Sequence, residues 1–299
     1  MKANKAEFDV LPEQEKAAVI ERDQETALQE EKELIQSARQ QDIETAKRAA
    51  ESGDGKALES LYKGFFGSRE NCELVAKLIP EDVYSISHPT IVDAGSSQGI
   101  LGNYVREKFT ERGGNAELVM IDTNSVAMKN SPVEASKVEG DLIHNPLANE
   151  SADVVILRSV LQYAEPRDQA RILGEIHRVL KPGGVLLSQF ASWDKQSQAD
   201  VMNKLFMIAN RRTSFFGTEE GIEMHKKMFD EVESGEGPTL YETFDDFFVT
   251  RINASQEVIQ EAKKYIHEHV EELEGVLTNT EDPFSWKMPF SILVCRKAK

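Results

Sequence analysis

Cysteine is scarce in this sequence: its two residues, Cys72 and Cys295, lie far apart. They form no Cys-x-x-Cys pair and no cluster with histidine, so neither a disulfide scaffold nor a metal site is expected. Long apolar runs are also missing. Because no stretch of about 18 apolar residues occurs, we expect no transmembrane helix. The first residues are followed by acids instead of an apolar stretch, unlike a secretory signal, and we predict a cytoplasmic protein.

Positively charged residues are also few compared with acidic ones. The 299 residues include 35 Lys and Arg against 52 Asp and Glu, which gives a formal net charge of −17. Binding to nucleic acid without sequence preference needs a basic face, and so does docking on anionic lipid. We therefore expect neither a nucleic-acid partner nor a membrane partner. Hydrophobic residues make up 40% of the chain, which is enough for a globular protein with a real core.

Residues 1–60 have few glycines and aromatics, namely Gly53, Gly55 and Phe8. Apolar residues recur at roughly helical spacing from Ile20 to Ala50 among dense charges. This pattern predicts an acidic, helical N-terminal arm. Two interpretations stay open: a surface for a protein partner, as in a coiled coil, or a solvated arm.

Residues 61–192 alternate between short apolar runs and helical patterns. The runs at 90–95, 118–122, 154–157 and 185–190 are typical of buried strands. The clearest helix is expected from Glu165 to Leu180, with Pro166 in its first turn. Strands that alternate with helices indicate βαβ units and a parallel sheet. The predicted fold class is therefore α/β, with a Rossmann-like core over residues 61–192.

Residues 193–285 break this alternation. They are rich in methionine and phenylalanine and contain a strong helical pattern from Ser255 to Leu273. Residues 289–295 then have the pattern of a strand. We predict a helical cap over residues 193–285, inserted before the final strand of the core sheet in residues 286–299. Such a cap would lie over the carboxyl edge of the sheet and close over a substrate.

One short motif carries chemistry: Asp93-Ala94-Gly95-Ser96-Ser97-Gln98-Gly99 ends the first strand. Small residues allow a sharp turn and a close approach to a ligand, and the helix that follows offers free N–H groups at its start. Asp122 ends the second strand, and Asp141 follows the next one. Carboxyl ends of parallel strands share one edge, so these three acids fit a nucleotide-like ligand whose ribose Asp122 would bind.

Together these segments resemble class I methyltransferases, which use S-adenosylmethionine. Asp93–Gly99 is similar to the first motif of the family, with Ser97 where a glycine is usual. Residues 145–155 resemble the family's loop into its fourth strand, and Glu175–Gly184 resembles its late signature. The resemblance covers roughly residues 70–192 and returns at 289–298. It implies a seven-stranded sheet with helices on both faces and an antiparallel last strand.

The resemblance also implies S-adenosylmethionine as the cofactor. The cofactor-binding residues that it implies are Asp93, Gly95, Ser96, Ser97, Gly99, Asp122, Thr123, Asp141, Leu142, Arg158 and Ser159. Small-molecule members often have a histidine where Gln162 or Tyr163 stands, so no general base is assigned. Tyr163, Arg211 and Arg212 are candidates for contact with the acceptor. His225, a lone histidine in a helical stretch, is a candidate base, but such a residue is expected to be solvated.

The implied function is in-line methyl transfer to oxygen or nitrogen of a small or medium-sized acceptor with an apolar body. A carboxylate acceptor needs no base and is compatible with the missing histidine. A second hypothesis is a non-catalytic methyltransferase-like module that binds a protein through the N-terminal arm. A nicotinamide-dependent dehydrogenase is disfavoured, because the glycines of the turn do not follow Gly-x-Gly-x-x-Gly.

Overall fold

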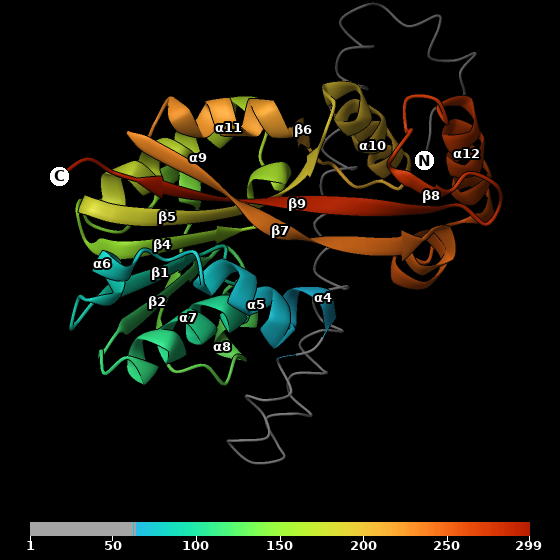
Figure 1. Cartoon of the computed structure of the whole chain (residues 1–299). Coiled ribbons are helices and arrows are strands. Elements are labelled where there is room, and N and C mark those ends of the chain that lie inside the picture. The colour runs from blue at the N-terminus through green and yellow to red at the C-terminus, as the bar shows by residue number, and fades with distance from the viewer. Residues whose placement is uncertain (1–61, 63) are drawn as a thin grey trace, which may run out of the picture. The chain divides into compact units, whose positions relative to one another are not determined.

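The computed structural model describes residues 62 and 64–299 (Figure 1). The N-terminal arm lies outside the described residues, so its helical character and its protein partner remain predictions. Within the described part, no helix combines the length and the apolar character that crossing a membrane requires. The cytoplasmic location likewise stays a prediction.

A nine-stranded sheet organises the described residues. Its strands are β1 (Thr90–Ala94), β2 (Glu117–Asp122), β3 (Ser136–Glu139), β4 (Ala152–Arg158), β5 (Leu180–Trp193), β6 (Phe216–Gly217), β7 (Glu231–Thr243), β8 (Leu277–Asn279) and β9 (Ser285–Arg296). Seven of them follow the order β3-β2-β1-β4-β5-β9-β7, and the short β6 and β8 pair with β5 and β9. β1 to β5 pair in parallel, whereas β9 is antiparallel to both β5 and β7. The expected α/β sheet with an antiparallel last strand is confirmed, but the sheet has nine strands where seven were expected.

Helices cover both faces of this sheet. They are α4 (Gly64–Gly67), α5 (Arg69–Ala76), α6 (Glu81–Tyr84), α7 (Ile100–Glu111), α8 (Ser125–Lys129), α9 (Pro166–Val179), α10 (Gln196–Ile208), α11 (Thr218–Lys226) and α12 (Gln256–Glu268). Two 3₁₀ turns, η1 (Leu142–His144) and η2 (Leu161–Tyr163), and a π-helical segment, η3 (Asp245–Arg251), complete the described elements. The helix expected at 165–180 is α9, and Pro166 does stand at its start.

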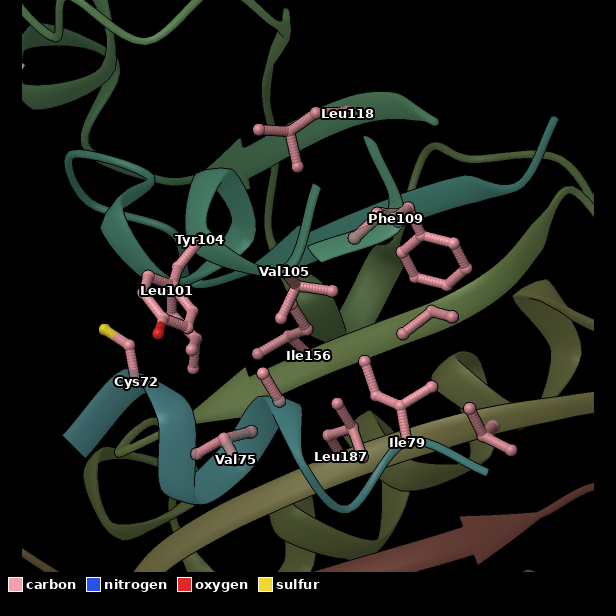
Figure 2. Packing of buried hydrophobic residues seen from close by; sticks show 14 of the residues in the cluster. Cys72, Val75, Ile79, Leu101, Tyr104, Val105, Phe109, Leu118, Ile156 and Leu187 are labelled. Atoms are coloured by element: carbon pink, nitrogen blue, oxygen red, sulfur yellow. The ribbon is translucent and has the colours of Figure 1, made fainter. Parts of the chain in front are cut away.

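Side chains alternate between the two faces along each strand, and two apolar layers result. On β5, Val185 and Leu187 face a cluster formed with α5 and α7, part of which Figure 2 shows. Leu186 and Phe190 face the opposite cluster, to which α9 contributes Ile172, Leu173, Ile176 and Val179. The sheet is therefore buried on both faces, as expected for a parallel α/β fold.

A third apolar cluster, here called the second lobe, forms around the far ends of the long strands β5, β7 and β9 (Figure 1). α10, η3 and α12 supply its other walls. It is unusually aromatic and includes Trp193, Phe206, Phe215, Phe247 and Trp286. Much of the predicted cap therefore builds an apolar lobe beside the core, whereas α11 packs in a cluster of the core sheet.

The helical character predicted for residues 193–285 is only partly right. α10, α11 and α12 lie there, but so does β7, a full strand of the main path, together with β6 and β8. β7 is not predicted from the sequence because it contains Gly235, Gly237 and Pro238 and has no regular apolar alternation. It is an edge strand, where proline and charge are tolerated, and its pairing with β9 holds it in place.

Candidate functional site

The turn between β1 and α7 is hydrogen-bonded to the end of β2. Gly95 N and Ser96 N both donate to the carbonyl oxygen of Ile121, at 2.8 and 3.2 Å. Gly95, Ser97 and Gly99 have φ angles of +71°, +49° and +73°, the left-handed region that favours glycine. Ser97 therefore stands in a backbone conformation that suits the glycine usual in the resembled family.

Asp122 ties this turn to the end of β2. Its Oδ2 accepts a hydrogen bond from Ser97 N at 2.8 Å, and its Oδ1 accepts one from Asn124 N at 2.7 Å. Thr123, between them, is exposed. Each carboxylate oxygen accepts at more than one position, so both can still receive a ligand hydroxyl.

Asp93 lies beneath the turn. It is 4% exposed, and its Oδ2 accepts from Gly102 N at 3.0 Å, in the first turn of α7. Burial raises the pKa of this carboxyl to about 6, while the nearby Arg158 charge and the Gly102 hydrogen bond oppose the rise. The hydrogen bond between Asp93 and Gly102 thus holds the start of α7 in place.

The third acid reaches the same edge of the sheet. Gly140 N donates to the carbonyl oxygen of Asp122 at 3.1 Å, so the end of β3 lies beside the end of β2. Asp141 is exposed and caps η1, with Oδ1 accepting from Ile143 N at 2.9 Å. Leu142 beside it is buried. The structure brings the predicted acids Asp122 and Asp141 to neighbouring strand ends.

Arg158 and Ser159 follow β4. Arg158 Nη1 donates to the carbonyl oxygen of Phe66 at 2.5 Å, and its guanidinium lies 5.9 Å from the centre of the Phe66 ring. Arg158 therefore anchors α4 against the sheet edge. Ser159 N donates to Gln189 O at 2.7 Å, and the residue has φ +56°. Its buried Oγ finds no partner among residues 62 and 64–299.

The acceptor candidates have different surroundings. Tyr163 is 70% exposed, and Arg212 is also exposed. Arg211 closes α10, with its N–H donating to Phe206 O at 2.8 Å, and its Nε is buried without a partner in the described structure. Ser214 N donates to Gln162 O at 2.7 Å, so the segment after α10 lies against η2. Arg211 therefore combines a buried, unpaired polar atom with a place in the chain just before the segment that lies against η2.

His225 is not solvated, which corrects the sequence-based expectation. It is fully buried between α11 and β5, and its ring stacks on Phe190 at 5.6 Å. Nδ1 lies 2.7 Å from Gly221 O and must donate to it, so Nε2 accepts from the Ser188 hydroxyl at 2.9 Å. Burial lowers its pKa to about 4, and a neutral imidazole results. Sequence alone gave no sign that α11 covers the sheet at this point.

Two further polar residues belong to the same region and lie outside the set drawn from the resemblance. Gln162 on η2 is 4% exposed, and Gln189 on β5 is 3% exposed. In each, Oε1 is buried and has no hydrogen-bond partner in the part of the chain that the structure describes. The sequence signal for Gln189 is the polar pair Ser188-Gln189 near the end of an otherwise apolar run, Val185–Phe190.

Comparison with known proteins now adds to this geometry. Residues 92–188 match a family model described as a methyltransferase domain, and this range spans β1 to β5 with the turn and the acids above. This part of the chain is thus similar to known methyltransferase domains. A crystal structure of a candidate methyltransferase from Bacillus halodurans has the same fold, with a TM-score of 0.61 and 19% identity, covering 75% of this chain and 99% of that one.

Curated proteins that are similar to part of this chain are named for different reactions. A carboxy-S-adenosyl-L-methionine synthase of Shewanella sediminis is 26% identical over 141 residues, 44% of this chain and 57% of that protein. A malonyl-[acyl-carrier protein] O-methyltransferase of Dechloromonas aromatica is 30% identical over 118 residues, 40% of this chain and 41% of that protein. The chain thus spans about half the length of these relatives, and the similarity does not extend over the whole of either protein.

Proposed function

We propose that this chain is an enzyme that transfers the methyl group of S-adenosylmethionine to a small or medium-sized acceptor. One observation carries the proposal: Asp122, Asp141 and the Gly95–Gly99 turn meet at the carboxyl ends of neighbouring parallel strands. This is the edge at which open α/β sheets bind nucleotide-like ligands. The family match over residues 92–188 supports the same reaction class.

The residues at this edge fit the proposed cofactor. Each oxygen of Asp122 already accepts one backbone N–H and can still accept one ribose hydroxyl. Ser96 Oγ is buried without a partner in the described structure, so it offers a further hydrogen bond to a ligand. Asp141 is exposed and can accept from an amino group. Thr123 and Leu142 lie next to these acids in the chain.

The main task of the protein in this reaction is to position the cofactor and the acceptor. When bound, S-adenosylmethionine supplies a methyl group on a positively charged sulfur, which is already a good leaving group. Asp122 would fix the ribose, and the second lobe would seat the acceptor and exclude water. Because Arg158 holds the Phe66 carbonyl, α4 lies against the same edge and could cover it.

The composition of the second lobe supports an acceptor with an apolar body. Trp193, Phe206, Phe215 and Phe247 form a continuous aromatic series, with ring centres 4.7 to 5.4 Å apart. An apolar, aromatic lobe beside the ends of β5 and β9 suits an acceptor with an apolar body better than a charged one. The net charge of −17 favours such an acceptor over nucleic acid.

Removing the Asp122 carboxylate tests the cofactor site. Asp122→Ala is expected to weaken binding of S-adenosylhomocysteine by about 30- to 150-fold, because two ribose hydrogen bonds worth about 2–3 kcal/mol are lost. Isothermal titration calorimetry measures this change. Glu117→Ala, at the exposed opposite end of β2, serves as the matched control and should bind like the wild type. An unchanged dissociation constant in Asp122→Ala would remove the ribose assignment.

The non-catalytic module remains the second candidate, and Ser97 in place of glycine favours it. One experiment distinguishes the two candidate functions. A catalytic chain binds S-adenosylhomocysteine and transfers labelled methyl from S-adenosylmethionine to some member of a metabolite panel, whereas a non-catalytic module transfers none.

A further inference from the structure

Two buried glutamines beside the proposed transfer site each have an amide oxygen without an internal partner. Gln162 and Gln189 are each more than nine-tenths buried, and Oε1 of each lacks a hydrogen bond in the part of the chain that the structure describes. Leaving a buried polar atom unpaired is costly, so such atoms usually serve a ligand or ordered water. By contrast, Gln198 is equally buried and fully used: Oε1 accepts from Lys195 N, and Nε2 donates to Glu274 O.

The two amides belong to one region of the molecule. The carbonyl oxygen of Gln189 accepts from Ser159 N, and η2, which carries Gln162, packs against β5. Gln189 pairs in register with Arg158, so both side chains lie on the same face of the sheet. The Gly95–Gly99 turn also lies against the segment between β4 and η2, since a Cβ on Gly95 would lie 2.3 Å from Val160 Cγ2. Both amides are thus next to the edge where the methyl group would be presented.

The chemistry of the two amides restricts the acceptor. A carbonyl oxygen accepts hydrogen bonds, so its partner must carry hydrogen, and a carboxylate at neutral pH carries none. Neither amide can remove a proton. A neutral amine can donate one N–H to an amide oxygen and still keep its lone pair for attack, whereas a hydroxyl must lose its proton to a base.

We propose that Gln162 and Gln189 bind and orient a neutral amine as the methyl acceptor, which rests on the proposed function. The nitrogen lone pair forms the new bond to the methyl carbon as the carbon–sulfur bond breaks. The electron pair of that bond stays on sulfur and gives neutral S-adenosylhomocysteine. The methylated nitrogen then releases one proton to solvent. This assignment favours N-methylation over carboxyl methylation.

Stability measurements without ligand give the first test. Gln162→Met and Gln189→Met remove an unpaired polar group at nearly constant volume, so each should raise the Tm by about 2–4 °C. Gln198→Met removes two hydrogen bonds and should lower it by a similar amount. A lowered Tm in both Gln162→Met and Gln189→Met would show that these amides have structural partners, which overturns the inference.

Ligand binding gives the second test. Aniline, phenol and benzoate, a matched amine, alcohol and carboxylate, are titrated near neutral pH into protein saturated with S-adenosylhomocysteine, with saturation-transfer NMR as the readout. Aniline should bind most tightly, and each Met variant should weaken it about tenfold while its affinity for S-adenosylhomocysteine stays unchanged. The inference is overturned if phenol or benzoate binds more tightly, if aniline binds the variants like the wild type, or if no probe binds. Failure to bind S-adenosylhomocysteine would instead remove the proposed function.

Discussion

Ser97 is the residue at which the Gly95–Gly99 turn departs from the first motif of the family that the sequence resembles. Its φ of +49° costs a non-glycine residue about 1–2 kcal/mol relative to glycine. A glycine at this position removes that cost but gives part of the gain back, because glycine has more conformational freedom to lose when the chain folds. Ser97→Gly should therefore raise the free energy of unfolding by about 0.5–1 kcal/mol in urea titrations. Its affinity for S-adenosylhomocysteine should stay equal or rise, because the Ser97 N–H that Asp122 binds is retained.

A serine outside the turn is the matched control. Ser125, at the start of α8, is not among the residues with positive φ, so Ser125→Gly adds flexibility without relieving strain and should lower stability. If the two variants change stability equally, the left-handed backbone at Ser97 is not the cause.

His225 makes stability depend on pH. Its pKa is lowered from 6.5 to about 4 in the folded protein, so the unfolded chain takes up a proton in this range and the folded chain does not. Stability is therefore complete above about pH 6.5 and falls by up to about 3 kcal/mol as the pH drops toward 4. Asp93 acts in the opposite sense, because its raised pKa keeps the folded state protonated up to about pH 6.

A comparison of variants separates these two groups. His225→Gln should lose the part of the acid destabilisation that belongs to the imidazole, and the opposite contribution of Asp93 should remain. Urea titrations at several pH values measure the difference. Equal pH profiles for wild type and His225→Gln would show that the buried imidazole does not contribute.

At the scale of elements, glycines in β7 and α9 should respond oppositely to alanine. A Cβ on Gly237 would lie 2.0 Å from the carbonyl oxygen of Phe290 on β9, and the backbone there cannot move freely. Gly237→Ala should therefore lower the free energy of unfolding by more than about 2 kcal/mol. A Cβ on Gly174, inside α9, meets nothing within 4 Å, so Gly174→Ala should add about 0.5–1 kcal/mol. Denaturant titrations that give the same sign for both would contradict this packing.

The elements that sequence predicts well are those whose own residues carry the pattern. β1, β2, β4 and β5 are buried on both faces and read as short apolar runs, and α9 has a clear apolar face and a proline start. β7 could not be predicted because its pairing with β9, not its own apolar residues, makes it a strand. The proposed cofactor edge followed from strand ends, whereas the surroundings of Gln189 and His225 depend on which distant elements pack over β5.

At the scale of the whole described molecule, β5 and β9 join the core to the second lobe. Residues of both strands belong to the core clusters and to the second lobe, so neither lobe can lose its strands while the other keeps them. The two tryptophans of the chain, Trp193 and Trp286, both lie in the second lobe. Tryptophan fluorescence and far-ultraviolet circular dichroism should therefore report the same unfolding midpoint. An earlier fluorescence transition would mean that the second lobe unfolds on its own.

The place of β9 between β5 and β7 has a consequence for synthesis. The ribosome makes β7 before β9, yet β7 pairs with no other strand of the main path. A growing chain therefore carries a strand with two open edges until the residues from Ser285 onward are made. The acidic residues of β7, Glu231, Glu233, Glu236 and Glu242, oppose edge-to-edge association of neighbouring nascent chains during this interval.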